Sequence, residues 1–122
     1  INLNTGKIKW QIPFGEYKEL TKKGIPITGT ENYGGLTGTE SGLLLATGTL
    51  DKQFRIFDAD NGKELWSFEL PFIGSSPPVT YQIDNEQYIL INATGSFSLK
   101  KGYPDLVDFG NKIMVFKLNN EK

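Results

Sequence analysis

The chain has 122 residues, with 13 Lys and Arg against 14 Asp and Glu, so its net charge is −1. It holds no His and no Cys, which excludes Ser-His-Asp and Cys-His nucleophile systems, His/Cys zinc sites and disulfides within this chain. The balanced charge gives no electrostatic reason to expect nucleic acid or an anionic membrane as a partner. No run approaches the ~18 apolar residues of a membrane-spanning helix, so we expect a soluble chain. Because it begins at Ile1 rather than Met, we also expect a processed or cut piece.

Short runs rich in β-branched and aromatic residues follow one another along the chain, separated by turn residues. This pattern is typical of an all-β fold. No segment carries the apolar i, i+3, i+4, i+7 stripe of an amphipathic helix. The predicted strands are Ile8–Phe14, Gly35–Thr39, Leu43–Thr49, Phe54–Asp58, Glu64–Leu70, Val79–Ile83, Tyr88–Ala93 and Lys112–Leu118.

The segments between these strands carry turn signals of two kinds. Residues 60–63 (DNGK) and 84–86 (DNE) predict tight turns, because Asn and Gly accept the positive φ that a hairpin needs. Residues 72–76, which Pro71, Pro77 and Pro78 flank or interrupt, predict a connection between sheets. The longer loops 16–32 and 96–110 are each rich in Gly and Pro, and we expect both at one rim of the fold.

An internal repeat is the strongest signal in the sequence. Residues 3–10 (LNTGKIKW) align with residues 59–66 (ADNGKELW) at a constant offset of 56. Each copy predicts a hairpin whose Gly makes the turn and whose Trp packs against a neighbouring unit, so we interpret Trp10 and Trp66 as packing residues rather than substrate platforms. Four predicted strands per repeat indicate a propeller blade. A third, partial copy is predicted at residues 113–116, with Asn120 and Lys122 where Asn61 and Lys63 would fall.

The repeat carries a resemblance to a known family. Ala59-x-x-Gly62-Lys63-x-x-Trp66, preceded by Asp58, resembles the tryptophan-docking motif of pyrroloquinoline quinone (PQQ) dehydrogenase propellers. An ordered series covering nearly the whole chain resembles the C-terminal region of the glucose dehydrogenase branch, and it comprises residues 32–35, 41–43, 48–55, 62–66, 78–81 and 87–88.

This resemblance implies that the chain is a C-terminal fragment with a partial β-propeller fold. Residues 1–14 would be the tail of a preceding blade and residues 15–31 a connecting loop. Residues 32–71 would form a complete four-stranded blade. Residues 72–122 would form a final blade of three strands that lacks its closing strand. Its exposed strand edges leave self-association as one option.

The resemblance also implies that Asn32, Tyr33 and Gly34, together with Thr94 and Gly95, face the propeller axis and line the PQQ pocket. Asn32 can hydrogen-bond to cofactor oxygens, Tyr33 can contact a flat ring, and Gly34 with its neighbour Gly35 permits close backbone approach. The alternative is that residues 32–35 are merely a turn that opens a strand. Glucose dehydrogenase relatives often carry His where this chain has Thr94, which leaves substrate preference and cofactor use open.

The family's catalytic Asp and Ca²⁺ ligands lie mostly upstream of the matched region, so we expect no catalytic residue and no metal ligand here. Asp105 and Asp108 could be Ca²⁺ ligands three residues apart, but we favour two solvated loop carboxylates. The glycosylation acceptor pattern at residues 92–94 is interpreted as accidental. The lysine pairs 22–23 and 100–101 are interpreted as solvated.

Two classes of function follow. In the first, the parent is a periplasmic PQQ-dependent sugar or alcohol dehydrogenase, with a membrane anchor as an option, and this segment alone does not turn over substrate. Its partners are the rest of the propeller and a small-molecule substrate, and not nucleic acid. In the second, the chain is a non-catalytic PQQ-like-repeat or WD-like scaffold for protein–protein interaction. The WD-like version is disfavoured because the usual Gly-His pair cannot occur and because the Trp follows Gly-Lys.

Overall fold

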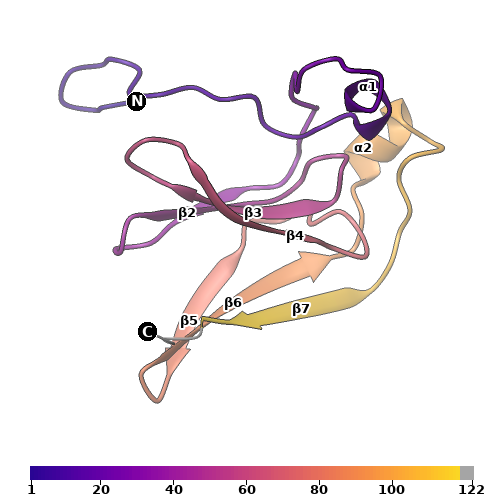
Figure 1. Ribbon diagram of the computed structural model, residues 1–122. Helices are drawn as coiled ribbons and strands as arrows, with labels where there is room; N and C mark the ends of the chain where they lie inside the picture. The colour runs from indigo at the N-terminus through magenta and orange to yellow at the C-terminus, as the bar shows by residue number, and fades with distance from the viewer. Residues whose placement is uncertain (119–122) are drawn as a thin grey trace.

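The structure is a computed structural model that describes residues 1–118, and these residues form two antiparallel sheets (Figure 1). The strand order is β1-β2-β3-β4 in the first sheet and β5-β6-β7 in the second, so within each sheet the strands pair in sequence order. The first sheet comprises β1 (Leu36–Gly38), β2 (Leu43–Ala46), β3 (Gln53–Asp58) and β4 (Glu64–Glu69), and the second comprises β5 (Val79–Ile83), β6 (Glu86–Ala93) and β7 (Lys112–Lys117).

The strand predictions are confirmed for these seven segments, with small differences at the ends. β2 ends at Ala46, earlier than predicted, because Gly48 takes a φ of 100° that breaks the extended backbone. The strand predicted at Ile8–Phe14 is wrong, because this segment joins no ladder within residues 1–118. Strand-like composition does not by itself supply the neighbouring strand that a ladder needs.

Two short helices lie in the two long loops, where no helix is predicted. They are α1 (Lys18–Thr21) and α2 (Phe97–Gly102), and both are too short to carry a periodic apolar stripe. Ser96 caps α2, because its Oγ accepts a hydrogen bond from the Leu99 amide at 3.4 Å. Within residues 1–118, no helix has both the length and the apolar character that a membrane crossing requires.

The main core lies between the two sheets. Phe54 of β3 is fully buried, and its ring centroid is 5.3 Å from that of Phe116 on β7. Because both sheets contribute apolar side chains to one cluster, neither sheet buries its inner face alone. The buried members of this cluster are Leu45, Phe54, Ile56, Leu70, Ile89, Ile91 and Ala93.

A second, smaller apolar cluster lies where the two long loops meet, and it contains Leu50, Ile73, Leu99 and Val107. The hydroxyl oxygens of Tyr17 and Tyr103, one from each loop, are 3.1 Å apart beside it. Figure 1 shows α1 and α2 close together at the same end of the molecule. The prediction that both loops lie at one rim is therefore confirmed.

The first two copies of the repeat fold into turns with matching hydrogen bonds. In the first copy, the Asn2 amide donates to the Lys7 carbonyl at 2.9 Å and the Gly6 amide donates to the Asn2 carbonyl at 2.8 Å. In the second copy, residues offset by 56 repeat both bonds: the Asp58 amide donates to the Lys63 carbonyl at 2.9 Å and the Gly62 amide to the Asp58 carbonyl at 2.8 Å. The repeat is thus present in the backbone as well as in the sequence.

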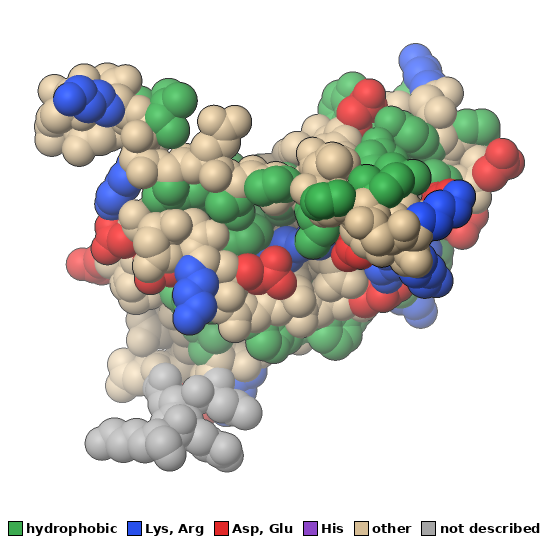
Figure 2. All heavy atoms as spheres, turned by 45° about the horizontal axis from the view of Figure 1, so that its top comes forward, with side chains coloured by type: hydrophobic (Ala, Val, Ile, Leu, Met, Phe, Trp, Pro, Cys, Tyr) green, Lys and Arg blue, Asp and Glu red, His purple; other side chains and the backbone are tan. Residues whose placement is uncertain are grey.

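Trp10 of the first copy packs on the turn of the second copy. Its Nε1 donates to the Ala59 carbonyl at 2.9 Å, and a Cβ atom on Gly62 would lie 2.6 Å from the indole, so only glycine fits beneath the ring. Figure 2 shows a row of hydrophobic side chains across the upper part of this face of the molecule. The prediction that Trp10 packs against the neighbouring unit is therefore confirmed.

Trp66, at the equivalent position of the second copy, has different neighbours. Its ring stacks on Phe68 at 6.0 Å and meets Phe116 edge-on at 5.7 Å. The side chain is 42% exposed. The third copy's predicted turn, which includes Asn120 and Lys122, lies outside the described residues.

Candidate functional site

Asn32 and Tyr33 belong to the NYGG segment (Asn32–Gly35), which leads into β1 and lies against the loop that follows β2. Asn32 pairs with Thr49 in an isolated antiparallel bridge, and the Tyr33 amide donates to the Gly48 carbonyl at 3.3 Å. Asn32 is exposed and Tyr33 is 53% exposed. The backbone of this segment is therefore held while both side chains remain accessible to a ligand.

The two glycines of the NYGG segment are explained by contacts within the chain. A Cβ atom on Gly34 would lie 2.2 Å from the Thr47 carbonyl oxygen. A Cβ atom on Gly35 would lie 2.3 Å from the Pro77 ring. The close approach that these glycines permit is toward the chain's own backbone and ring, and their role beside a cofactor stays a prediction.

Thr94 and Gly95 follow β6 in the second sheet. The Gly95 amide donates to the Ile73 carbonyl at 2.9 Å, and a Cβ atom on Gly95 would lie 2.4 Å from the Asp108 carbonyl oxygen. Thr94 is partly buried, and its hydroxyl oxygen is 3.4 Å from that of Ser75. Thr94 thus offers a hydroxyl at the edge of the connection between the sheets.

The connection of residues 72–78 joins the two predicted site segments, one from each sheet. The Thr47 hydroxyl donates to the Ser76 carbonyl at 3.2 Å, and Gly35 packs on Pro77. With the contact of Thr94 to the same connection, both predicted segments lie at one end of the pair of sheets. Each of the two segments contacts residues of this connection, and the contacts described here do not join the two segments directly.

A buried polar network supports the loop beneath the NYGG segment. Arg55 donates to both carboxylate oxygens of Asp51, through Nη1 at 3.1 Å and through Nη2 at 2.5 Å. The Thr49 hydroxyl accepts from Arg55 at 3.2 Å and donates to Asp51 at 2.6 Å. The Glu16 amide donates to the same carboxylate at 2.9 Å. The network therefore ties the long N-terminal loop, the β2–β3 loop and β3 together.

The electrostatics of Asp51 follow from these contacts. Burial alone would raise the pKa of the Asp51 carboxyl. The hydrogen bonds from Arg55 and Thr49, together with the charge of Arg55, outweigh burial and hold this pKa below its ordinary value. Asp51 is therefore a charged, fully engaged acceptor at neutral pH rather than a proton-transfer group.

Sequence reasoning missed the role of Asp51 and Arg55. The available signal is the charge of Arg55 inside the apolar run FRIF, four residues after an Asp. A charged residue at a buried strand position requires a partner, because an unpaired buried charge is costly.

The weaker sequence candidates do not assemble into a site. Asp105 and Asp108 lie in the loop after α2, where the Lys100 ammonium donates to the Pro104 carbonyl at 2.5 Å and to the Val107 carbonyl at 2.6 Å. Within residues 1–118, no group of three or more Asp or Glu side chains is placed to hold a metal ion. Lys22–Lys23 is exposed, as is Asn92 of the glycosylation acceptor pattern.

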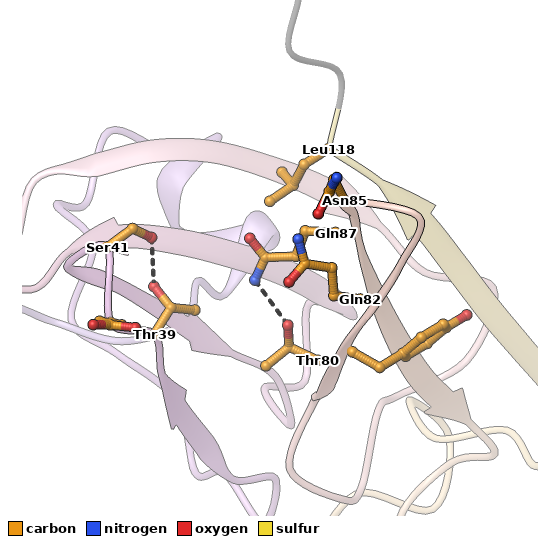
Figure 3. Close-up of a pocket in the computed structure, with 9 residues that line it drawn as sticks. Thr39, Ser41, Thr80, Gln82, Asn85, Gln87 and Leu118 are labelled. Carbon is orange, nitrogen blue, oxygen red and sulfur yellow. Dashed lines mark hydrogen bonds between the residues drawn. The ribbon is translucent and has the colours of Figure 1, made fainter.

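A polar cleft of about 580 Å³ lies between the β1–β2 turn and the β5–β6 hairpin (Figure 3). The hydroxyl oxygens of Thr39 and Ser41 are 2.9 Å apart, and Gln87 Nε2 donates to the Thr80 hydroxyl at 2.8 Å. These four side chains hydrogen-bond in two pairs. None of the predicted site residues lines the cleft.

Comparison with known proteins gives a consistent result. A family model described as "PQQ: Glucose/ethanol/alcohol dehydrogenase, beta-propeller domain" matches residues 1–89. The chain is 38% identical over 103 residues to a probable quinate dehydrogenase (quinone) of Xanthomonas campestris pv. juglandis, covering 79% of this chain and 13% of that protein. It is 35% identical over 121 residues to a glycerol dehydrogenase large subunit of Gluconobacter oxydans, covering 95% of this chain and 16% of that protein.

A solved structure is similar in fold. It is a quinohemoprotein alcohol dehydrogenase from Pseudomonas putida HK5, matched with a TM-score of 0.55 and 27% identity over 69% of this chain and 13% of that one. The chain thus spans 13% to 16% of the length of these three proteins. This match and the two antiparallel sheets confirm the expected all-β, partial β-propeller fold.

Proposed function

The chain belongs to the family of PQQ-dependent glucose, ethanol and alcohol dehydrogenase β-propellers, and we propose that it is a propeller segment of an enzyme that oxidises a small sugar or alcohol. The family match over residues 1–89 carries this proposal. Because the relatives named above are dehydrogenases, the match supports an enzyme over a PQQ-like-repeat or WD-like scaffold. The glucose branch is the narrower proposal, since the family model spans glucose and alcohol enzymes alike.

We further propose that the segment contributes part of the quinone pocket through Asn32, Tyr33 and Gly34 of the NYGG segment and through Thr94 and Gly95. The carbonyl and carboxylate oxygens of PQQ need hydrogen-bond donors, and the Asn32 amide and Thr94 hydroxyl are donors of the right kind. The half-exposed Tyr33 ring offers a flat face. The donor chemistry therefore fits the cofactor, and these residues would bind and orient it.

PQQ, when bound, supplies the redox chemistry of substrate oxidation, and the family resemblance adds a Ca²⁺ ion and a carboxylate base. We propose that the ligands of this ion and the base come from other parts of the parent. Asp51, the buried carboxylate of this segment, is fully engaged by Arg55 and Thr49 and is not a candidate base. The contribution of this segment is binding and orientation, so we propose that it is not catalytic by itself.

The contact of Trp10 with the Ala59 carbonyl and with Gly62 supports the tryptophan-docking interpretation, in which each blade's indole packs on the next blade's turn. We propose that contacts of the same kind join this segment to the rest of a larger ring. A periplasmic location, a membrane anchor in the parent and pairing through the free edge of β7 are further parts of this proposal.

The proposal is tested with the complete dehydrogenase that contains this segment, reconstituted with PQQ and Ca²⁺ and compared with the same protein without PQQ. We expect quinone absorbance in the loaded protein and reduction of an artificial electron acceptor with at least one aldose or alcohol, with quinate and glycerol among the substrates tried. Absence of both signals across the panel would reject the enzyme and favour the scaffold.

A further inference from the structure

We infer that Thr49 is a positioning residue that carries the order of the buried Asp51–Arg55 ion pair to the NYGG segment. This inference rests on the proposed role of Asn32 and Tyr33 at the quinone. It concerns how these residues are held, because the side chains that contact a cofactor must themselves be fixed.

The first step is the position of Thr49, which is fully buried at the junction of three segments. A Cβ atom on Gly15 would lie 2.8 Å from the Thr49 methyl carbon, so the N-terminal loop packs directly against this side chain. On its other side, Thr49 pairs through its backbone with Asn32. Because Thr49 is the bridge partner of Asn32, a shift of Thr49 displaces the backbone of Asn32.

The second step is the way in which the Thr49 side chain is fixed. Its hydroxyl accepts from Arg55 Nη1 at 3.2 Å and donates to Asp51 Oδ1 at 2.6 Å, so it is engaged both as an acceptor and as a donor. Both partners are charged and nearly fully buried, and such hydrogen bonds are stronger than neutral ones. Asp51 and Arg55 thereby hold the Thr49 hydroxyl in one orientation, and the ion pair between them fixes their own positions.

The third step is the close backbone contact that transmits this order. The Tyr33 amide donates to the Gly48 carbonyl at 3.3 Å, and a Cβ atom on Gly48 would lie 2.0 Å from the Gly34 nitrogen. The two backbones thus touch with no side chain between them, so displacement of residues 48–49 is passed directly to residues 32–34. Asn32 and Tyr33 are exposed, and within residues 1–118 the bridge to Thr49 and the bond to the Gly48 carbonyl tie their backbone to the first sheet.

The test uses three Thr variants of the complete dehydrogenase. Thr49→Val removes the hydroxyl but keeps the shape, whereas Thr49→Ser keeps the hydroxyl and removes the methyl group. Thr80→Val is the matched control, since Thr80 also loses one hydrogen bond, from Gln87, but lies in β5 by the polar cleft. The first readout is amide hydrogen exchange of the apoprotein at Tyr33, with the amide of Ile89 in the core reporting global unfolding.

We expect Thr49→Val to accelerate exchange at Tyr33 by about tenfold with no comparable change at Ile89, because one hydrogen bond to each of two charged groups is lost. Thr49→Ser and Thr80→Val should exchange like the wild type at Tyr33. An unchanged rate in Thr49→Val, or an equal acceleration in Thr49→Ser, would overturn the inference.

The second readout is the dissociation constant of PQQ, which we expect to rise by about three- to tenfold in Thr49→Val and to stay unchanged in Thr80→Val. Failure of the proposed function is seen separately. If exchange at Tyr33 accelerates while PQQ affinity does not change, Thr49 positions the NYGG segment, but that segment is not part of the quinone pocket. If the exchange rate does not respond, the positioning inference fails whatever the affinity.

Discussion

The loops that join the second and third strands of the two sheets occupy equivalent places and are stabilised in different ways. In the first sheet, residues 47–52 form a short loop held by the buried Asp51–Arg55 pair. In the second sheet, residues 94–111 form a long loop that contains α2, and its side chains Leu99 and Val107 are fully buried.

The difference shows how loop length decides the kind of interaction that is available. The six-residue loop buries a single large apolar side chain, Leu50, and charged hydrogen bonds fix its conformation. A longer loop can fold a helix over a small apolar cluster, and Leu99 and Val107 supply half of the buried members of this one, beside Leu50 and Ile73. Both loops lie beside residues predicted to line the quinone pocket, so the two sides of that pocket should respond differently to charge removal, cavities and pH.

The largest effect is expected from breaking the polar loop. Asp51→Asn removes the buried carboxylate of the Arg55 guanidinium and leaves it only the half-exposed Glu64 at 3.4 Å, among residues 1–118, which should lower the free energy of unfolding by about 3 kcal/mol. Urea unfolding of the chain measures this change. The matched control is Asp60→Asn, whose ion pair with Lys9 is exposed and should leave stability close to that of the wild type. Equal effects in the two variants would show that the buried pair does not hold the loop.

The apolar loop should respond to a cavity instead. Leu99→Ala removes a fully buried side chain and should cost about 2–3 kcal/mol in urea unfolding. The control is Phe97→Ala in the same helix, because Phe97 is 70% exposed and its replacement should change stability by less than about 0.5 kcal/mol. A loss in Leu99→Ala no greater than in Phe97→Ala would contradict the view that this loop is held by its apolar cluster.

Acid should distinguish the two loops. The pKa of Asp51 is lowered in the folded chain, so the stability contributed by its charge is fully present above the unfolded value of about 3.9. This contribution is lost as pH falls through the folded-state pKa. The difference in unfolding free energy between wild type and Asp51→Asn should therefore shrink below about pH 4, whereas the Leu99→Ala difference should not. A difference for Asp51→Asn that is constant with pH is the opposing result.

The smallest effect is expected at alkaline pH, where the two long loops meet. The hydrogen bond with Tyr17, followed by burial, raises the pKa of Tyr103 to about 12. A raised pKa stabilises the folded chain below the unfolded value of about 10, and this contribution is lost as pH rises from there toward 12. Any advantage of wild type over Tyr103→Phe should disappear in that range, measured by denaturant unfolding at each pH. An advantage that persists above the folded-state pKa would contradict this assignment.

The sequence predicts those parts of the fold that depend on local pattern. The alternating strands, the two matching turns and the packing of Trp10 are readable because turn geometry and side-chain periodicity are set by neighbouring residues. The strand predicted at Ile8–Phe14 fails because pairing depends on a partner that the segment does not carry. The two helices are not predicted because a single turn such as α1 gives no periodic signal.

The candidate site is predictable only in part, for a related reason. The family resemblance predicts Asn32 and Thr94, and the structure shows that each belongs to a segment beside the same connection between the sheets. The glycines of the NYGG segment are needed for contacts within the chain, which no local pattern reveals. The Asp51–Arg55 pair was missed because a salt bridge between i and i+4 residues is usually ascribed to a helix surface, and here it spans a buried loop and strand.

The central claim is that the NYGG segment forms part of the proposed quinone pocket, and PQQ titration of the apo form of the complete parent protein tests it most directly. We predict that Asn32→Ala raises the dissociation constant by at least about tenfold, because it removes a hydrogen bond to a charged or carbonyl oxygen of the cofactor. Asn4→Ala, which changes an exposed Asn in the first turn, should bind like the wild type. Wild-type affinity in Asn32→Ala would contradict the account.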